Sequence, residues 1–128
     1  MKPMKIWANL GVKDLKRTTE FYNKLGFTSN GASKELTSFL VGTDNFVIHF
    51  FLKDILQANI NAKISGLEDG NEIIFTLSAE SKDEVNNWEK EVKDAGGTII
   101  SGAAEFGEGY YGFVFADPDG HLFNVFYM

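Results

Sequence analysis

The sequence predicts an α+β fold built from two β-α-β-β-β modules, which cover residues 1–65 and 66–128 of one 128-residue domain. Two observations support this prediction. A strand, a helix, a glycine and further strands follow one another twice, around Lys13-Asp14 to Gly26 and around Lys82-Asp83 to Gly96. The chain also ends in a hairpin, and its strands need partners elsewhere because an isolated hairpin is only marginally stable.

The first module begins with a strand expected over residues 5–12, and Asp14 can cap the helix that follows it. The apolar side of this helix recurs at three- and four-residue spacing, in Leu15, Thr18, Tyr22 and Leu25. Gly26 ends the helix. The module continues with three strands and a connecting helix, expected at residues 27–30, 34–41, 45–52 and 53–63. A linker over 66–70 then joins the two modules.

The second module repeats this order, starting with a strand over residues 71–79 and a helix capped by Ser81 or Asp83. A short strand over 98–101 follows the helix. The segment 103–111 contains two glycines and is expected to form a flexible flap. The chain closes with a hairpin of strands 110–116 and 122–128, joined by the turn sequence Asp117-Pro118-Asp119-Gly120.

Composition excludes several classes of function. The chain has no cysteine, which rules out disulfides, thiolate metal sites and a cysteine nucleophile, and which fits a cytoplasmic location. A net charge of −6 argues against nucleic acid as a partner. The longest apolar run, over 46–52, is too short to span a membrane, and residues 1–5 lead into no apolar signal sequence.

Alternation along the strands separates two faces. Several central strands show one uniformly apolar face, which we expect to carry the helices. The opposite face mixes aromatic with isolated polar side chains, namely Trp7, Asn9, His49, Phe51, Glu72, Thr76 and Asn124. Such a surface suits a small-molecule site, with a solvated face or a subunit interface as the alternatives.

Two stretches resemble a known family. These are Leu10-Gly-Val12-Lys-Asp14-Leu15 with Phe21-Tyr22 and Leu25-Gly26-Phe27, and the late turn Asp117-Pro-Asp-Gly-His121. With the repeat, they make essentially the whole chain resemble the vicinal oxygen chelate superfamily of glyoxalase I, bleomycin-resistance proteins and extradiol dioxygenases. The resemblance implies that the modules curl their mixed sheets into a cup with the helices outside, and that the protein forms a homodimer.

The resemblance also implies where a metal would bind. Metal-dependent members carry up to four ligands on four strands, and the matching positions here are Trp7, His49, Glu72 and Asn124. Indole is a donor only and cannot ligate a cation, and asparagine brings no charge. His49 and Glu72 remain, fewer than the three ligands of a catalytic zinc site. We therefore expect no cofactor, with a divalent metal (Zn, Ni, Mn or Fe) on His49 and Glu72 as the alternative.

These observations predict a protein that binds a small aromatic or amphipathic molecule in an aromatic-lined cup. The side chains expected to line it are Trp7, Asn9, His49, Phe51, Glu72, Tyr110, Tyr111, Asn124 and Phe126. Phe106 lies in the expected flap beside the two tyrosines. Two alternatives stay open: a metal-dependent lyase or isomerase resembling lactoylglutathione lyase, and a structural dimer module. The expected partners are a small-molecule ligand and a second copy of the chain, without nucleic acid or membrane.

Overall fold

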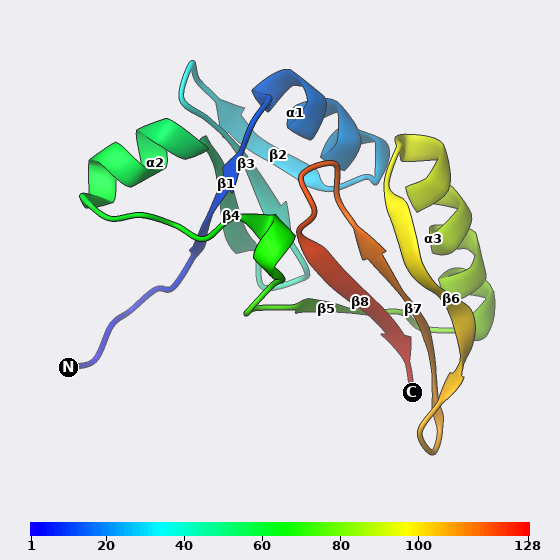
Figure 1. Ribbon diagram of the computed structural model, residues 1–128. Helices are drawn as coiled ribbons and strands as arrows, with labels where there is room; N and C mark the ends of the chain where they lie inside the picture. Colours follow the sequence, from blue (N-terminus) through cyan, green and yellow to red (C-terminus); the bar gives the residue numbers. More distant parts are fainter. The chain divides into compact units, whose positions relative to one another are not determined.

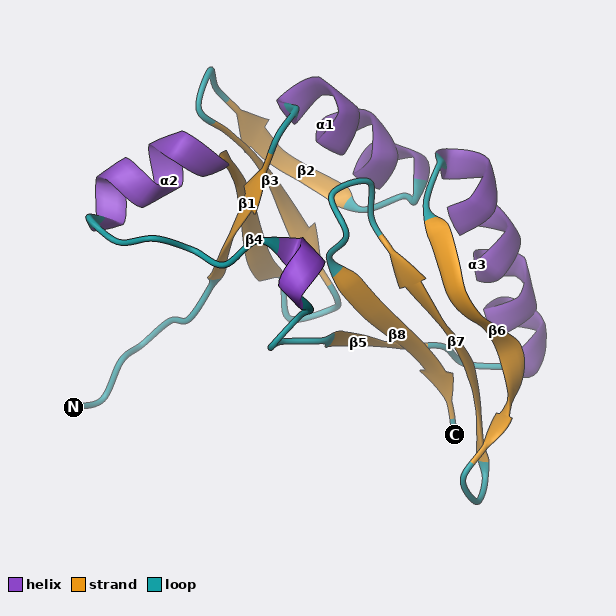
Figure 2. Cartoon of the chain, viewed as in Figure 1, coloured by secondary structure: helices purple, strands orange, loops and turns teal.

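The computed structural model describes residues 1–128, except for the side chain of Leu67. The chain folds into two compact units, Met1–Ser65 and Gly66–Met128. Each unit contains a four-stranded mixed sheet and a long helix (Figures 1 and 2). The predicted α+β class with two β-α-β-β-β modules is confirmed. Among the described residues, no helix is long and apolar enough to cross a membrane.

The first unit has the strand order β1-β4-β3-β2, in which β1 runs parallel to β4 and the other neighbours are antiparallel. Its elements are β1 (Ala8–Val12), α1 (Leu15–Lys24), β2 (Thr28–Ala32), β3 (Leu36–Val41), β4 (Phe46–Leu52) and α2 (Lys53–Ile60). The predicted start of α1 is confirmed, because the Asp14 carboxylate accepts a hydrogen bond of 3.0 Å from the backbone N–H of Arg17.

The second unit repeats this topology with the order β5-β8-β7-β6, in which β5 runs parallel to β8. Its elements are a 3₁₀ turn (Leu67–Asp69), β5 (Phe75–Ser78), α3 (Lys82–Ala95), β6 (Thr98–Phe106), β7 (Tyr110–Ala116) and β8 (Leu122–Tyr127). Ser81 caps α3 by accepting a 3.0 Å hydrogen bond from the N–H of Glu84. The helix ends at Gly96, whose φ of +98° suits glycine.

Aromatic rings form the core between helix and sheet in each unit. In the first unit, Tyr22 of α1 stacks on Phe50 of β4 with ring centroids 4.5 Å apart, and both side chains are fully buried. In the second unit, Phe115 of β7 stacks on Phe123 of β8 at 5.1 Å, and α3 contributes the buried Val85. These contacts hold one face of each sheet against its helix.

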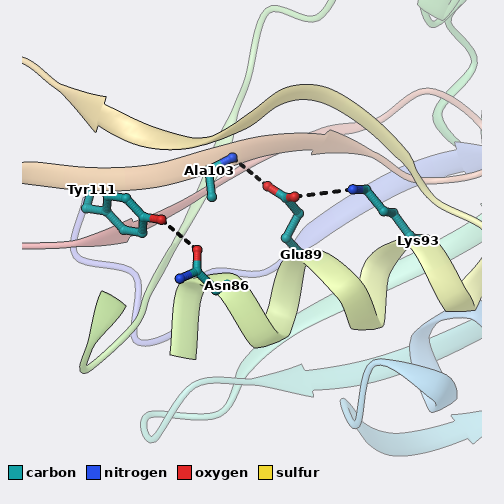
Figure 3. A network of polar contacts seen from close by, with 5 residues as sticks. All are labelled: Asn86, Glu89, Lys93, Ala103 and Tyr111. Carbon is teal, nitrogen blue, oxygen red and sulfur yellow. Dashed lines mark hydrogen bonds and ion pairs between the residues drawn. The ribbon is translucent and has the colours of Figure 1, made fainter. Parts of the chain in front are cut away.

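Polar contacts add a second connection between α3 and the sheet (Figure 3). The pairing of β6 with β7 shifts register between Ser101 and Ala104. At this irregularity the backbone N–H of Ala103 donates to the Glu89 carboxylate, which also pairs with Lys93 at 3.3 Å. The helix thus supplies the acceptor that an irregular strand cannot obtain from its neighbour.

The first turn of α3 makes an ion pair with β6. Lys82 Nζ lies 2.8 Å from Glu105 Oε1 and 5.3 Å from the centre of the Tyr111 ring. The hydrogen bond to Glu105 raises the pKa of Lys82, and the same hydrogen bond lowers the pKa of Glu105. Both side chains are exposed, so solvent screens the pair.

Several predicted boundaries are wrong. The strand predicted over 5–12 begins only at Ala8, so Trp7 lies before it, in a segment that leads away from the sheet (Figure 1). The strand predicted over 71–79 begins at Phe75, which leaves Glu72 outside it. Phe75 pairs with Phe123, the second residue of β8. Residues before 74 therefore face the turn that precedes β8 and have no strand to pair with.

The segment 103–111, expected to be a loop that serves as a flap, is not a loop. β6 continues to Phe106 and pairs with β7 as far as Tyr110, so most of this segment belongs to a hairpin. Gly107 and Gly109, with φ of +60° and +81°, lie in its turn. The helix predicted over 53–63 ends earlier, at Ile60, because Asn61 adopts a left-handed conformation with φ of 53°.

We predict that Phe50→Ala lowers the free energy of unfolding by about 3–5 kcal/mol, because it removes a fully buried ring and leaves a cavity against Tyr22. Urea unfolding followed by circular dichroism measures this change. Ile60→Ala is the matched control, since Ile60 is 51% exposed at the end of α2 and should change stability by less than about 0.5 kcal/mol. Equal effects of the two variants would contradict the assignment of the core.

We predict that Lys82→Met raises the pKa of Glu105 toward the ordinary value of a glutamate, because the ion pair is lost. Since the pKa of Glu105 is lowered in the folded state, the pair stabilises the protein above the ordinary glutamate pKa. That contribution disappears as the pH falls through the lowered value. An NMR titration of the Glu105 carboxyl carbon measures the shift. Lys93→Met, which removes the partner of Glu89, should leave the pKa of Glu105 unchanged.

Candidate functional site

The first unit has one sheet face that carries polar and aromatic side chains together. Along β4, Ile48 and Phe50 are buried on the α1 side, while His49 and Phe51 alternate to the opposite face and are half-buried. The parallel register places Asn9 of β1 beside His49. We call the face with Asn9, His49 and Phe51 the mixed face of the first unit, as the alternation predicted.

Three aromatic rings form a row at this face. The Trp7 ring meets the imidazole of His49 edge to face, with centroids 6.5 Å apart and an interplanar angle of 71°. Phe51 contacts the same imidazole at 6.1 Å and 85°. Trp7 lies just before β1, and its side chain is 52% exposed. His49 is thus held between two rings, one of which presents a large apolar surface to solvent.

His49 carries a polar atom without a partner. Its Nδ1 is buried, and it neither accepts nor donates a hydrogen bond among the described residues. The side chain in register with it on β3 is the buried Ser38, whose hydroxyl already accepts a 3.0 Å hydrogen bond from the Asn30 amide. A buried polar atom left unpaired costs about 1–3 kcal/mol. Nδ1 is therefore a polar atom that the described residues leave unsatisfied.

The second unit has a corresponding mixed face. Phe123 and Val125 of β8 are buried on the α3 side, while Asn124 and Phe126 alternate to the opposite face and are half-buried. Asn124 lies in register with Thr76 of β5, and its Nδ2 donates to the Thr76 hydroxyl at 3.4 Å. We call the face with Thr76, Asn124 and Phe126 the mixed face of the second unit.

An aromatic cluster of Phe106, Tyr110 and Phe126 lies at one end of this face. The Phe106 and Phe126 centroids are 4.6 Å apart, and Tyr110 lies 6.3 Å from Phe106 and 6.1 Å from Phe126. Phe106 and Tyr110 are each 40% exposed. A Cβ at Gly112 would clash first with the backbone oxygen of Val125 on β8 and would also lie 2.9 Å from Cδ1 of Phe126, so only glycine fits at this position.

Several of the residues predicted to line the site lie on these two faces: Asn9, His49 and Phe51 in the first unit, with Trp7 against His49, and Tyr110, Asn124 and Phe126 in the second. Tyr111 does not join them. It lies on the α3 side, where its hydroxyl donates to Asn86 Oδ1 at 2.6 Å (Figure 3). Glu72 is exposed before β5.

Sequence reasoning missed three residues of these faces: Asn30, Ser38 and Gly112. The signal for Ser38 was available, because it occupies the alternating position of β3 that pairs with His49. Asn30 could not be placed, because the pairing of β2 with β3 shifts register between Ser29 and Ala32. The requirement for glycine at position 112 comes from the Val125 backbone and the Phe126 ring, which belong to another strand.

The metal hypothesis needs His49 and Glu72 together. Because the two residues belong to different units, the structure does not test whether their side chains lie close enough to share a metal ion. Among the described residues, no three side chains of histidine, aspartate or glutamate gather into a cluster that could hold a metal. The other two matching positions, Trp7 and Asn124, provide an N–H donor and a neutral amide. The donors present do not fit a three-ligand catalytic centre.

His121 contributes to the turn and not to either mixed face. It is buried, and its backbone N–H donates to the Asp117 carboxylate at 2.9 Å. The same oxygen accepts the N–H of Asp119. The aspartate thus organises the turn that joins β7 to β8.

Solved structures of other proteins resemble this chain over nearly its whole length. A hypothetical protein SA1046 from S. aureus is 26% identical, with a TM-score of 0.87 over 100% of this chain and 96% of that one. A glyoxalase-related enzyme from Fulvimarina pelagi is 20% identical, with a TM-score of 0.87 over 98% and 89%. A lactoylglutathione lyase from Agrobacterium tumefaciens is also 20% identical, with a TM-score of 0.73 over 98% and 95%.

A search of curated proteins finds no match. The model of one protein family, however, matches residues 6–125, which include most of both modules. The solved structures with less than 25% identity support the fold alone. The family match is made on the sequence and covers most of the chain, so it shows the family. The chain belongs to the Glyoxalase/Bleomycin resistance protein/Dioxygenase superfamily.

Proposed function

We propose that this protein binds a small aromatic or amphipathic molecule on the mixed faces of its sheets. The observation that carries the proposal is the position of His49. Its buried Nδ1 has no hydrogen-bond partner among the described residues, and its ring lies between Trp7 and Phe51. A ligand with an aromatic ring and one polar atom would stack on the indole and pair with this nitrogen.

The composition of the faces supports this proposal. Binding sites for small molecules combine a predominantly aromatic and apolar lining with a few polar groups that orient the ligand. In the first unit, Trp7 and Phe51 provide apolar area and Asn9 and His49 provide polar groups. In the second unit, Phe126 and Asn124 do the same. A face that was only solvated would expose fewer large rings, whereas Trp7 and Tyr110 are 52% and 40% exposed.

The family membership is compatible with a binding protein, an enzyme or a resistance protein. Solved relatives bear names as different as lactoylglutathione lyase and glyoxalase/bleomycin resistance protein. A homodimer and a cytoplasmic location remain predictions.

We predict that Trp7→Ala weakens binding of the amphipathic aromatic probe 1-anilinonaphthalene-8-sulfonate at least about fivefold, since a stacked aromatic contact contributes about 1 kcal/mol or more. A fluorescence titration measures the dissociation constant, and circular dichroism checks that the fold persists. Ile60→Ala is the control, because it removes an exposed apolar side chain from α2. Unchanged affinity in Trp7→Ala, or an equal loss in both variants, would overturn the proposal.

A metal-dependent lyase or isomerase is the second candidate, and the same buried Nδ1 of His49 favours it, because an unpartnered imidazole nitrogen can coordinate a cation. Glu72 would be the second ligand. A metal bound there would polarise vicinal oxygen atoms of a substrate as a Lewis acid.

Elemental analysis of protein purified without chelators and without a histidine tag separates the two candidates. Under the binding proposal we expect far less than one equivalent of Zn, Ni, Mn or Fe. One equivalent in the native protein and in Trp7→Ala, with loss in His49→Ala, would establish the metal-dependent candidate instead. Trp7→Ala is the appropriate control because indole cannot ligate a metal.

A further inference from the structure

We propose that the mixed face of the second unit recognises a planar, uncharged heteroaromatic ring whose edge carries an N–H donor next to a carbonyl acceptor. Rings of this lactam class include the dione rings of flavins and pteridines. This inference rests on the proposed function and names the ligand class. It depends on three features of the face: an aromatic surface, small neighbouring side chains and one carboxamide.

The aromatic surface is the cluster of Phe106, Tyr110 and Phe126. Phe106 and Tyr110 are nearly parallel, with an interplanar angle of 20°, and Phe126 contacts Phe106 at 4.6 Å. The rings support one another, and two of them remain 40% exposed. A planar ligand would cover this apolar area, and stacked aromatic pairs gain stability beyond the burial of area.

The residues in register around Phe126 are small. Gly112 of β7 lies on one side and Ser78 of β5 on the other, and Ala104 of β6 pairs with Gly112. Side chains that face the same way on adjacent strands lie about 5 Å apart, so bulky residues here would screen the Phe126 ring. Glycine, serine and alanine are too small to screen this ring. A ligand wider than one benzene ring can therefore lie along this end of the sheet.

The carboxamide is that of Asn124. It lies two residues before Phe126 on the same face, which corresponds to about 7 Å along the strand. One amide N–H donates to Thr76, whereas Oδ1 has no protein partner among the described residues. Oδ1 can accept a hydrogen bond and the second N–H can donate one. This pair complements an adjacent N–H and carbonyl, as when asparagine reads the edge of adenine.

The charges around the cluster disfavour an anionic ligand, because Glu108 is exposed in the turn between Phe106 and Tyr110. Thr76, Ser78 and Asn124 are neutral. Glu105 is next to Phe106 in sequence, but it alternates to the α3 side and pairs with Lys82 at 2.8 Å. A ligand edge that meets Asn124 would therefore meet dipoles and no fixed charge, and an anionic or cationic edge would gain no ion pair there.

The test compares riboflavin with N3-methylriboflavin, which keeps the stacking ring and loses the N–H donor. Flavin fluorescence titrated with the native protein gives both dissociation constants. We expect riboflavin to bind about tenfold more tightly, as one lost hydrogen bond predicts. In Asn124→Leu this preference should disappear, and Phe126→Ala should weaken both ligands. Tyr111→Phe, on the α3 side, is the control and should change neither constant.

The comparison of the two flavins on the native protein does not depend on the folding of any variant. Equal affinity for both would overturn the lactam inference and leave the proposed function intact. Binding of 1-anilinonaphthalene-8-sulfonate without binding of riboflavin would have the same consequence. Failure of the native protein to bind either aromatic probe would overturn both proposals.

Discussion

The aromatic rings packed on the helix side of each sheet determine which face of each unit is left to bind a ligand. Tyr22 on Phe50 and Phe115 on Phe123 hold one face of each sheet against the core. Because side chains alternate with a period of two, every neighbour of a core residue must lie on the opposite face. His49 precedes Phe50, and Asn124 follows Phe123. A slip of one residue would move both polar groups into the core.

The opposite faces carry groups that lower the stability of a sheet with a purely structural role. In the first unit, a buried nitrogen of His49 has no partner among the described residues, and Trp7 stays half exposed. In the second unit, two of the three rings in the cluster are 40% exposed. A sequence selected for stability alone would replace such groups with polar residues on the surface or with satisfied pairs inside. Departures from local consistency of this kind occur at functional sites, which is why both proposals concern these faces.

Sequence reasoning succeeded where the physical cause is local. The helices followed from apolar spacing together with the caps Asp14 and Ser81, and the strand Tyr110–Ala116 followed from its composition and the Asp-Pro-Asp-Gly turn. It failed where the cause lies in a partner strand. The start of β5 depends on where β8 begins, and the length of β6 depends on its pairing with β7. The orientation of Tyr111 follows from that same pairing, which puts it on the side of Asn86.

The resemblance places Trp7 and Asn124 at two of the family's metal positions, and both residues agree with the proposed function. Trp7 replaces a possible ligand with an aromatic surface, and Asn124 replaces a carboxylate with a neutral amide. An indole cannot ligate a cation and a neutral amide ligates one only weakly, whereas under the two proposals the indole would stack on an uncharged ring and the amide would hydrogen-bond to it. Loss of a metal ligand alone would have allowed many residue types at these positions. An indole beside His49 and a carboxamide two residues before Phe126 are groups that the proposed binding of a planar organic molecule can use.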